Sequence, residues 1–435
     1  MASRIEKWLK IDKSIPQRIA VLESKYAELY GKNPRNHTVF LTPGRAEALG
    51  GHTDYNEGFT ISANIPQNLL ILGEAREDNI GLVNSLNQDN SVIPFTVDGK
   101  KLILEKSNPG DKDAWSNYIK GVVWGLLKYG IPLKGFNAVL ESTIPTGAGV
   151  SSSAAIEVAA AKLAVGLSKA EITDLELVKV CREAENSYVG VPCGYLDQAT
   201  ITLSDGNWLF ISHRADENLP FTFKNIPLDL QALGLSMVVG FDPEIKHILT
   251  EGKFKARKKA CDYSILILQE LLGEKVVSLR DVSPKKLQPF YNKLSGKLGE
   301  RRARWIKHIV EENERVKKAA NALIKGDTIT MGKLMTIAGK SAIFGYELGE
   351  DTDELGFVYN LVVKEKKAWG VKGIRNMGGG FNPTTIALIE TDKVERYKES
   401  VSKYYQAAFK REYRLFDFIP APATVRLKMD SLERI

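Results

Sequence analysis

Residues 145–156, PTGAGVSSSAAI, have the residue types of a phosphate-binding loop. Two glycines bracket an alanine, which allows a tight turn close to a ligand, and three serines lead into an alanine-rich segment that favours a helix. The first N–H groups and the dipole of such a helix attract phosphate, and the hydroxyls can donate to phosphate or ligate a hard cation. The lysine of a P-loop is absent. A glycine turn capped by serine before a buried helix is the structural alternative.

A second polar stretch, GRAEALGGHTDYNEG at residues 44–58, holds a guanidinium, an imidazole and a carboxylate on Arg45, His52 and Asp54. This combination suits recognition of vicinal hydroxyls, because the carboxylate accepts from two hydroxyls while Arg and His donate. Turn-forming residues predict a short strand over 39–41 followed by a loop through residue 58. Polar residues are common in any loop, so this stretch alone leaves a structural interpretation open.

Two further stretches carry candidate chemistry. In residues 183–198, EAENSYVGVPCGYLDQ, a helix-borne Glu185 is placed to hold a metal ion and a turn-borne Asp197 to face a substrate hydroxyl. A surface carboxylate and a helix N-cap are the structural alternatives for these two residues. Residues 375–381, RNMGGGF, form a glycine cluster that either makes a turn or approaches a ligand closely.

Hydrophobic periodicity predicts the elements that must position these stretches. A strand over 136–140 leads into the serine-rich loop and a helix over 153–167 follows it, so the order is strand, glycine turn, helix. The chain begins with a predicted helix over 17–30. A looser composition over 214–227 marks a domain boundary, and a mostly helical second half then opens with a strand over 236–241.

Composition sets the class of protein. The chain has 435 residues, of which 43% are hydrophobic and 26% charged, which is ordinary for a globular protein and long enough for two domains. The formal charge of +7 and basic runs at 253–259 and 301–307 suggest nucleic-acid binding. However, apolar residues recur within both runs at helical spacing, as on a solvated helix face. We therefore expect no nucleic-acid partner.

The cysteines and the apolar runs indicate the compartment. Cys181, Cys193 and Cys261 form no CxxC pair, so we expect neither a disulfide framework nor a zinc site, and a reducing, cytoplasmic location. No apolar run approaches the length of about 20 residues that a membrane helix needs, so we expect no signal peptide and no membrane partner.

The four stretches together resemble the galactokinase family of the GHMP kinase superfamily. GRAEALGGHTDYNEG, PTGAGVSSSAA and MGGGF stand in the family's order and at similar spacing, and the resemblance covers nearly the whole chain. Supporting stretches are WSNYIKG, AENSYVGVPCGYLDQ and HIVEENERV, at residues 115–121, 184–198 and 308–316. The resemblance implies an α+β fold in two lobes, the GHMP kinase fold, with mixed sheets and helices and an active site between the lobes.

The same resemblance implies a domain division and an activity. It divides the chain into an N-terminal helical extension over 1–35, an N-terminal lobe with the phosphate-binding loop over 36–214, and a C-terminal lobe over 215–435. It implies an ATP-dependent sugar 1-kinase that transfers the γ-phosphoryl group of ATP to the anomeric hydroxyl of galactose. Its cofactors are then ATP and Mg²⁺, its partners are the sugar and ATP, and a monomer is expected.

The resemblance also implies the roles of individual residues. Asp197 faces the anomeric hydroxyl and Arg45 stabilises negative charge beside it, while Ser153 and Glu185 hold Mg²⁺ between the β- and γ-phosphates. Direct in-line transfer then depends on positioning and charge stabilisation. The implied sugar-binding residues are Arg45, Gly51, His52, Asp54, Gly194 and Phe254, and the implied phosphate-binding residues are Gly147, Ala148, Gly149, Val150, Ser151, Ser152 and Ser153.

Three positions depart from the family's pattern. Gly51 stands where the family has a glutamate that binds the sugar C6 hydroxyl, and Phe254 stands where a tyrosine reaches the sugar. After Phe381, Asn382 and Pro383 replace two glycines, which removes a backbone N–H and stiffens the loop. These departures leave the phosphoryl-transfer residues intact and bear on the identity of the sugar.

Gly51 has two opposite consequences for the sugar. Loss of the carboxylate removes a hydrogen bond worth about 1.5 to 3 kcal/mol, but it also removes repulsion against a C6 carboxylate. Galacturonate, or another sugar modified at C6, is therefore an alternative substrate. A side chain of the same stretch, such as Glu47 or Glu57, or a water molecule would instead restore the contact to galactose.

Two other functional classes compete with the sugar 1-kinase. One is a galactokinase-like sugar sensor that binds sugar and ATP without turnover, and the other is a GHMP kinase for mevalonate, homoserine or a heptose phosphate. The intact stretch 151–155, together with Arg45, Glu185 and Asp197, favours catalysis over the sensor. The run HTDYN at residues 52–56 resembles only the galactokinase branch and argues against the other acceptors.

Overall fold

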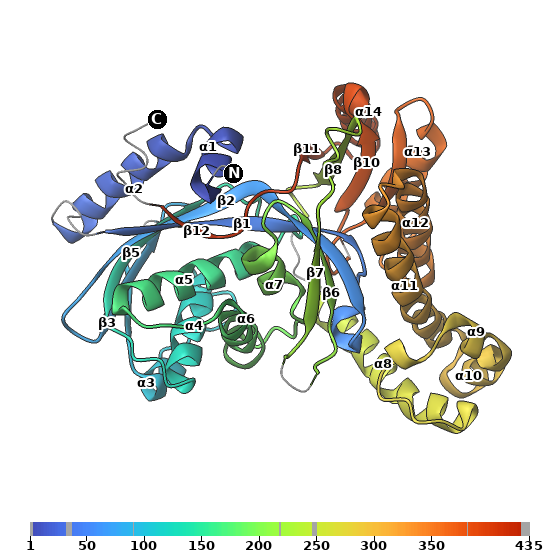
Figure 1. Ribbon diagram of the computed structural model, residues 1–435, viewed down its shortest axis with the longest axis horizontal. Coiled ribbons are helices and arrows are strands. Elements are labelled where there is room, and N and C mark those ends of the chain that lie inside the picture. The colour runs from blue at the N-terminus through green and yellow to red at the C-terminus, as the bar shows by residue number, and fades with distance from the viewer. Residues whose placement is uncertain are drawn as a thin grey trace.

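The computed structural model describes residues 3–31, 37–89, 91–216, 219–245, 250–380 and 382–427 (Figure 1). Within these ranges the chain forms one sheet of eight strands and one of four, each packed against helices. The larger sheet lies on the left of Figure 1 and the smaller sheet, with the long helices of the second half, on the right. Sheets of this kind combined with separate helices make an α+β protein in two lobes.

The larger sheet is built mainly from the first half of the chain. Its strands are β1 (Thr38–Leu49), β2 (Phe59–Ala75), β3 (Ile80–Ser85), β4 (Ile93–Thr96), β5 (Phe136–Ser142), β6 (Trp208–Ser212), β7 (Thr222–Ile226) and β12 (Val425–Leu427). They run in the order β12-β1-β2-β5-β3-β4, and the pair β6 and β7 joins the early part of β2. All neighbours are antiparallel except β3 and β5.

Helices cover both faces of this sheet (Figure 1). They are α1 (Arg4–Ile11), α2 (Ile15–Tyr30), α3 (Gly99–Leu104), α4 (Asn117–Lys128), α5 (Ser152–Ser168), α6 (Asp174–Glu183) and α7 (Leu196–Leu203), with a π-helix η3 (Ala184–Val189) after α6. Side chains of a strand alternate between its faces. Val39 and Leu41 accordingly pack with Trp8 and Leu22 of α1 and α2, while Phe40 joins the core on the side of α5.

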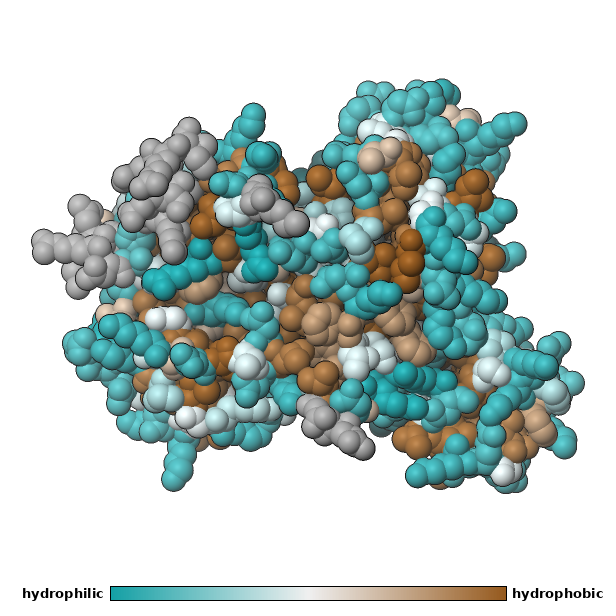
Figure 2. Space-filling model, in the orientation of Figure 1, coloured by the Kyte–Doolittle hydropathy of each residue, from teal (hydrophilic) through white to brown (hydrophobic). Residues whose placement is uncertain are grey.

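The smaller sheet and a second set of helices form the other lobe. Its strands run in the antiparallel order β11 (Arg414–Phe418), β8 (Leu235–Phe241), β10 (Thr385–Glu390), β9 (Val371–Asn376). The helices are α8 (Thr250–Leu272), α9 (Pro284–Leu287), α10 (Tyr291–Leu298), α11 (Glu300–Ile324), α12 (Thr328–Lys340), α13 (Glu354–Glu365) and α14 (Val394–Phe409). The space-filling view shows mainly hydrophilic side chains on the outward faces of these helices (Figure 2).

The predicted order of strand, glycine turn and helix is confirmed around the serine-rich loop. Strand β5 leads into a turn over residues 146–150, and α5 begins at Ser152. Helix α5 is rich in alanine, which lets it pack closely against β1 and β2, and ten of its side chains are buried. The loop is therefore held between the central strands and a helix that is anchored by packing.

The prediction of a loop over residues 42–49 is wrong. Strand β1 continues from Thr38 to Leu49 and pairs with β2 throughout, with register shifts between Pro43 and Arg45 and between Glu47 and Leu49. Bulges of this kind absorb residues that a regular strand does not tolerate and re-aim the side chains beside them. Arg45 and Glu47 thus project from a strand of the central sheet instead of from a loop.

The predicted domain boundary after residue 214 is crossed by two contacts. Strand β7 pairs with β6 across it, and β12 returns to pair with β1 in the first sheet. Helix α11 also belongs to both cores, since its early residues pack in the second lobe and its later residues in the first. The predicted domain ranges 1–35, 36–214 and 215–435 stay predictions. Within the described ranges, no helix combines the length and apolar character needed to cross a membrane.

Candidate active site

An ion pair between Arg45 and Asp197 lies at the centre of the site. The Arg45 Nε and Nη2 atoms donate to the two carboxylate oxygens of Asp197 at 2.7 and 2.8 Å. Burial opposes the charge of Arg45, but Asp197 outweighs it and raises the pKa of the guanidinium. Asp197 is the second residue of α7, so the prediction that it lies in a turn is wrong. A bidentate pair of this geometry fixes both side chains.

The serine-rich loop is hydrogen-bonded to this ion pair. The Ser151 hydroxyl donates to the Oδ2 atom of Asp197, and Arg45 Nη1 donates to the carbonyl oxygen of Gly149 at 2.6 Å. Ser151 directly precedes α5 and has a left-handed backbone with φ of 60°. Such a conformation is unfavourable for a residue with a side chain, and it persists where surrounding contacts enforce it. The contact with Asp197 is one such restraint.

A cavity of about 200 Å³ opens beside the ion pair. It brings together residues of both lobes, since Phe254 comes from α8 and Gly379 from the glycine cluster. Of the predicted sugar-binding residues, Gly51 is not in the cavity lining. The lining residues are Arg45, Glu47, His52, Asp54, Tyr55, Glu185, Val191, Pro192, Cys193, Gly194, Leu196, Asp197, Phe254, Gly378 and Gly379.

Asp54 is held at the cavity wall by a backbone contact. The Gly194 N–H donates to its Oδ2 atom at 3.1 Å. A Cβ atom at position 194 would lie 2.2 Å from the same oxygen, so only glycine allows this approach. Burial, with a further contribution from nearby Asp197, raises the pKa of Asp54 to about 6. Burial therefore disfavours the charged form of this carboxylate.

His52 differs from the sequence-based expectation. Its Nε2 atom lies 3.1 Å from the Gly379 carbonyl oxygen and its Nδ1 atom 2.8 Å from the Tyr55 hydroxyl. A carbonyl oxygen only accepts, so Nε2 carries the hydrogen and Nδ1 accepts from Tyr55. Burial, and then the charge of Arg257, lower the pKa of the imidazole to about 3, which keeps it neutral. The hydrogen that we expected His52 to donate to a ligand is donated to the glycine cluster.

Glu185 lies on the π-helix η3, directly after α6. Its carboxylate accepts from Gln198 Nε2 at 2.8 Å and from the Ser153 hydroxyl. Burial and the charge of Asp197 raise the pKa of Glu185 to about 7. The serine-rich loop and the acidic helix thus approach each other at the partly buried Ser153 and the buried Glu185, and the metal-binding roles predicted for these two residues stay predictions.

Comparison with known proteins identifies relatives of this chain. The GHMP kinases N terminal domain matches residues 117–205 and the galactokinase galactose-binding signature matches residues 24–74. The galactokinase of Streptomyces coelicolor is 33% identical and covers 93% of this chain and 97% of its own length. The galactokinase of Clostridium acetobutylicum is 32% identical, with 89% and 93% covered. The chain belongs to the galactokinase family.

Solved structures agree with this family assignment. The crystal structure of Lactococcus lactis galactokinase complexed with galactose has a TM-score of 0.82 at 27% identity and covers 94% of this chain and 100% of that chain. The Methanococcus jannaschii mevalonate kinase, at 18% identity and a TM-score of 0.59, shares the fold. The predicted membership of the galactokinase family and the predicted two-lobed GHMP kinase fold are both confirmed.

The residues around Glu185 fit a magnesium ion shared with a nucleotide. Mg²⁺ prefers oxygen ligands, and it commonly takes one or two from the protein and the rest from phosphates and water. Ser153 and Glu185 offer a hydroxyl and a carboxylate side by side. Within the described residues no cluster of three or more His, Cys, Asp or Glu side chains could hold a metal by itself. The site thus suits a metal–nucleotide complex better than a free ion.

The residue that follows the glycine cluster contacts the serine-rich loop. Asn382 Nδ2 donates to the carbonyl oxygen of Gly147 at 3.0 Å and to Thr384 Oγ1 at 2.9 Å. The departure at position 382 therefore supplies a side-chain contact between the two motifs. Phe381, the last residue of the cluster, lies outside the described residues.

Sequence reasoning missed two buried groups beside the cavity. Arg375 of β9 lies at 3.3 Å from Glu47 and at 3.2 Å from Glu312 of α11. Glu157 of α5 shares Gln198 Nε2 with Glu185, and burial raises the pKa of Glu157 well above its usual value. The sequence could have pointed to Glu157 as a buried carboxylate, because it is the one acidic residue in a helix made mostly of alanine and other apolar residues.

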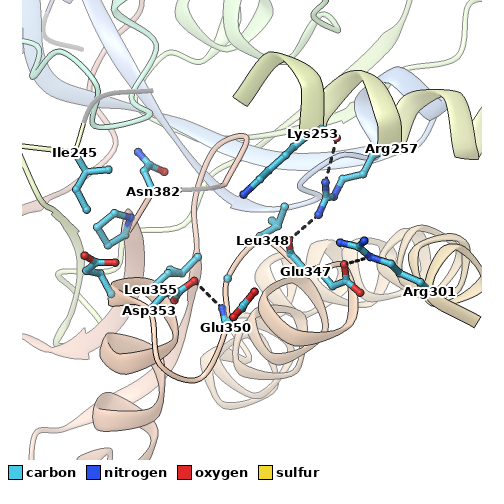
Figure 3. Close-up of a pocket in the computed structure, with 13 residues that line it drawn as sticks. Ile245, Lys253, Arg257, Arg301, Glu347, Leu348, Glu350, Asp353, Leu355 and Asn382 are labelled. Carbon is cyan, nitrogen blue, oxygen red and sulfur yellow. Dashed lines mark hydrogen bonds and ion pairs between the residues drawn. The ribbon is translucent and has the colours of Figure 1, made fainter. Parts of the chain in front are cut away.

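Another cavity, of about 260 Å³, lies between α8 and the segment that precedes α13 (Figure 3). Its charged walls are paired with one another: Arg301 Nε donates to Glu347 at 2.6 Å, and the Glu350 N–H donates to Asp353 at 2.7 Å. Arg257 donates to the carbonyl oxygen of Glu347 at 2.6 Å. None of the residues predicted to bind sugar, phosphate or metal lines this cavity.

Proposed function

We propose that this protein is an ATP-dependent sugar 1-kinase that transfers the γ-phosphoryl group of ATP to the anomeric hydroxyl of galactose. The observation that carries the proposal is the bidentate pair of Arg45 and Asp197, tied to the serine-rich loop at the mouth of a polar cavity. Galactokinases related to this chain over nearly its whole length support the same activity.

In this proposal each central residue has a role. Asp197 accepts the hydrogen of the anomeric hydroxyl and holds its oxygen in line with the γ-phosphorus. Arg45, which remains charged, neutralises the charge that develops on the transferred group and on the carboxylate. Asp54 accepts from hydroxyls on the sugar ring. Since phosphoryl transfer proceeds through a loose transition state, this positioning and charge stabilisation account for the catalysis.

The phosphates of ATP occupy the turn at the start of α5. Residues 147–153 offer backbone N–H groups and hydroxyls, and the helix dipole adds a favourable field. Ser153 and Glu185 hold Mg²⁺ in this proposal. When bound, the ion neutralises phosphate charge and helps to orient the transferred group.

The alternatives from the sequence lose support. The three galactokinases reported above are more similar to this chain than the mevalonate kinase, which shares only the fold, and none of their names indicates a uronate substrate or a sensor. The catalytic pair is also assembled, whereas a sensor would not need it. Galactose is therefore the substrate that we propose, and a monomeric state and a cytoplasmic location stay predictions.

A coupled assay of ADP release tests this proposal. Purified protein is given Mg·ATP and each of a panel of free sugars and uronic acids. We expect ADP release with galactose and little with glucose or galacturonate. If no sugar supports ADP release while nucleotide still binds, the sensor is correct; if galacturonate is the better substrate, the assignment of the sugar is wrong.

A further inference from the structure

The two glutamates of the second polar stretch, Glu47 and Glu57, have different surroundings. Glu57 pairs with Arg214 Nε at 2.7 Å, and 41% of its side chain is exposed. Glu47 lines the cavity beside Arg45 and is only 2% exposed. Of the two glutamates that could replace the carboxylate missing at position 51, Glu47 lines the cavity and Glu57 does not.

Glu47 retains hydrogen-bonding capacity. Among the described residues its close polar contact is with Arg375 Nη2 at 3.3 Å, and neither Glu47 Oε1 nor Arg375 Nη2 makes a hydrogen bond. Glu312, in contrast, accepts from Arg315 Nε at 2.6 Å, from the Gly50 N–H at 3.0 Å and from Arg375 Nη1 at 3.2 Å. Oε1 is covered by Arg375 and by the backbone at position 51, so a ligand cannot reach it. Within the described residues Oε2 accepts no hydrogen bond either, and it is the oxygen that a ligand hydroxyl in the cavity can reach.

The position of Glu47 on β1 indicates which part of the sugar it meets. Residues two apart on a strand project from the same face and lie about 7 Å apart along it. Arg45 stands at the reacting end of the cavity, because it holds Asp197. Glu47 therefore stands further along the cavity wall than Arg45, so the substrate hydroxyl that it meets is not the anomeric one.

The absence of a side chain at Gly51 leaves room for the ion pair of Glu47 and Arg375. A Cβ atom at position 51 would lie 2.8 Å from Arg375 Nη2 and 3.3 Å from Glu47 Oε1. Arg375 is fully buried and cannot move freely, since its Nε atom donates to the Asn376 carbonyl oxygen at 2.8 Å. A side chain at position 51 would thus displace the ion pair, and the glycine makes room for it.

We propose that Glu47, held in place by Arg375, is a specificity-determining residue that accepts a hydrogen bond from the exocyclic C6 hydroxyl of the sugar. Burial raises the pKa of Glu47 to about 7. Above that pH the charged carboxylate repels a carboxylate at C6, so it selects a hexose over the corresponding uronate. Arg375 is a positioning residue in this assignment, because it orients Glu47 without contacting the sugar. The inference rests on the proposed sugar kinase activity.

The test compares three sugars that differ at C6: galactose, 6-deoxygalactose and galacturonate. In the protein with Glu47→Ala we expect the preference for galactose over 6-deoxygalactose, measured as a ratio of kcat/KM values, to fall about tenfold or more, since a lost charge-assisted hydrogen bond has an effect of this size. The kcat/KM for 6-deoxygalactose should change by less than about threefold, because that sugar offers no hydroxyl to Glu47. Glu47→Gln keeps the shape and removes the charge, so it should raise the ratio of galacturonate to galactose turnover.

Controls separate this inference from a folding defect and from the proposed function itself. Glu57→Gln removes a carboxylate from the same stretch, outside the cavity, and should leave both ratios unchanged. Equal losses on galactose and 6-deoxygalactose in Glu47→Ala would mean that Glu47 is only structural, and an unchanged uronate ratio in Glu47→Gln would overturn the charge selection. Failure of the unaltered protein to phosphorylate any sugar would overturn the proposed function instead.

Discussion

Asp197 is the residue on which the proposed chemistry depends most directly. It accepts hydrogen bonds from the Arg45 guanidinium and from the Ser151 hydroxyl, which fix both of its oxygens. A neutral amide at this position would lose the ion pair and the ability to accept the substrate proton. The serine-rich loop therefore helps to hold Asp197 in place.

Asp197→Asn should reduce kcat by at least about 100-fold while nucleotide binding is kept, because the change removes charge at the reacting oxygen. The measurement is steady-state ADP release with galactose, together with nucleotide titration. Asp205→Asn is a matched control, since Asp205 pairs with Arg4 at 3.1 Å on the surface. Near-normal turnover in Asp197→Asn would contradict the assigned role.

Asp54 should give the enzyme an acidic limb in its pH profile. Burial raises the pKa of Asp54 to about 6, so its carboxylate takes up a proton as the pH falls through 6. The protonated group then accepts hydrogen bonds from sugar hydroxyls poorly. We expect kcat/KM for galactose to fall about tenfold per pH unit below this value. Because the pKa of Asp54 is higher in the folded state than its usual value of 3.8, protonation of this group favours the folded state as the pH falls from 6 toward 3.8. Asp54 therefore does not cause unfolding in this pH range.

The profile of Asp54→Asn tests this assignment. The variant should be less active at neutral pH and should lack the limb near pH 6. If the limb remains at the same pH, another group is responsible for it. Thermal unfolding at pH 5 and pH 7 checks that both proteins stay folded.

At the scale of elements, α11 connects the two cores through Glu312. Burial by itself would raise the pKa of Glu312, but Arg315 and Arg375 outweigh it and lower the pKa to about 2. The carboxylate also accepts from the Gly50 N–H, directly after β1. A helix of the second lobe thus satisfies a backbone donor of the first.

Glu312→Gln should lower the free energy of unfolding by about 3 to 5 kcal/mol, since it leaves buried guanidinium groups without their partner. A group with a lowered pKa contributes its stability above 4.5 and loses it as the pH falls through 2, so the difference from the unaltered protein should shrink between these values. Denaturant unfolding at pH 7 and pH 3 measures it. Glu311→Gln, which removes a partly exposed partner of Arg315, should cost less than about 1 kcal/mol.

The sequence predicted the chemical stretches better than the elements that carry them. Residue types that suit hydroxyl recognition and the resemblance to galactokinases predicted roles for Arg45, Asp54 and Asp197, and the structure brings all three side chains to one cavity. Turn-forming residues around position 44 predicted a loop, but pairing with β2 makes this segment a bulged strand. The contact of Glu47 with Arg375 could not be predicted, because it joins strands of different sheets and depends on the absence of a side chain at Gly51.

At the scale of the whole molecule, the N-terminal helices act as a cover for the larger sheet. Trp8 of α1 is fully buried, and its indole N–H donates to the Ala423 carbonyl oxygen at 3.3 Å. Leu70 and Leu72 of β2 and Val139 of β5 pack in the same cluster. This face lies on the side of the sheet away from α5, so it stabilises the protein without touching the cavity.

Trp8→Ala should therefore lower the free energy of unfolding by about 3 to 5 kcal/mol, the usual effect of removing a large buried side chain. The KM for galactose should not change at a temperature where the variant is folded. Thermal unfolding and steady-state kinetics on the same sample measure the two effects. Leu104→Ala, at a side chain that is 87% exposed, should change neither, and a raised KM in Trp8→Ala would indicate coupling between this cover and the site.

The pairing of β12 with β1 imposes an order on synthesis. Residues 39–41 leave the ribosome early, but their partners at 425–427 emerge only after almost all of the rest of the chain. During that interval one edge of β1 has unpaired backbone groups, and such an edge invites association with other chains. The nascent protein is therefore exposed to aggregation through β1 until β12 pairs with it, and a chaperone that shields this edge would improve its yield.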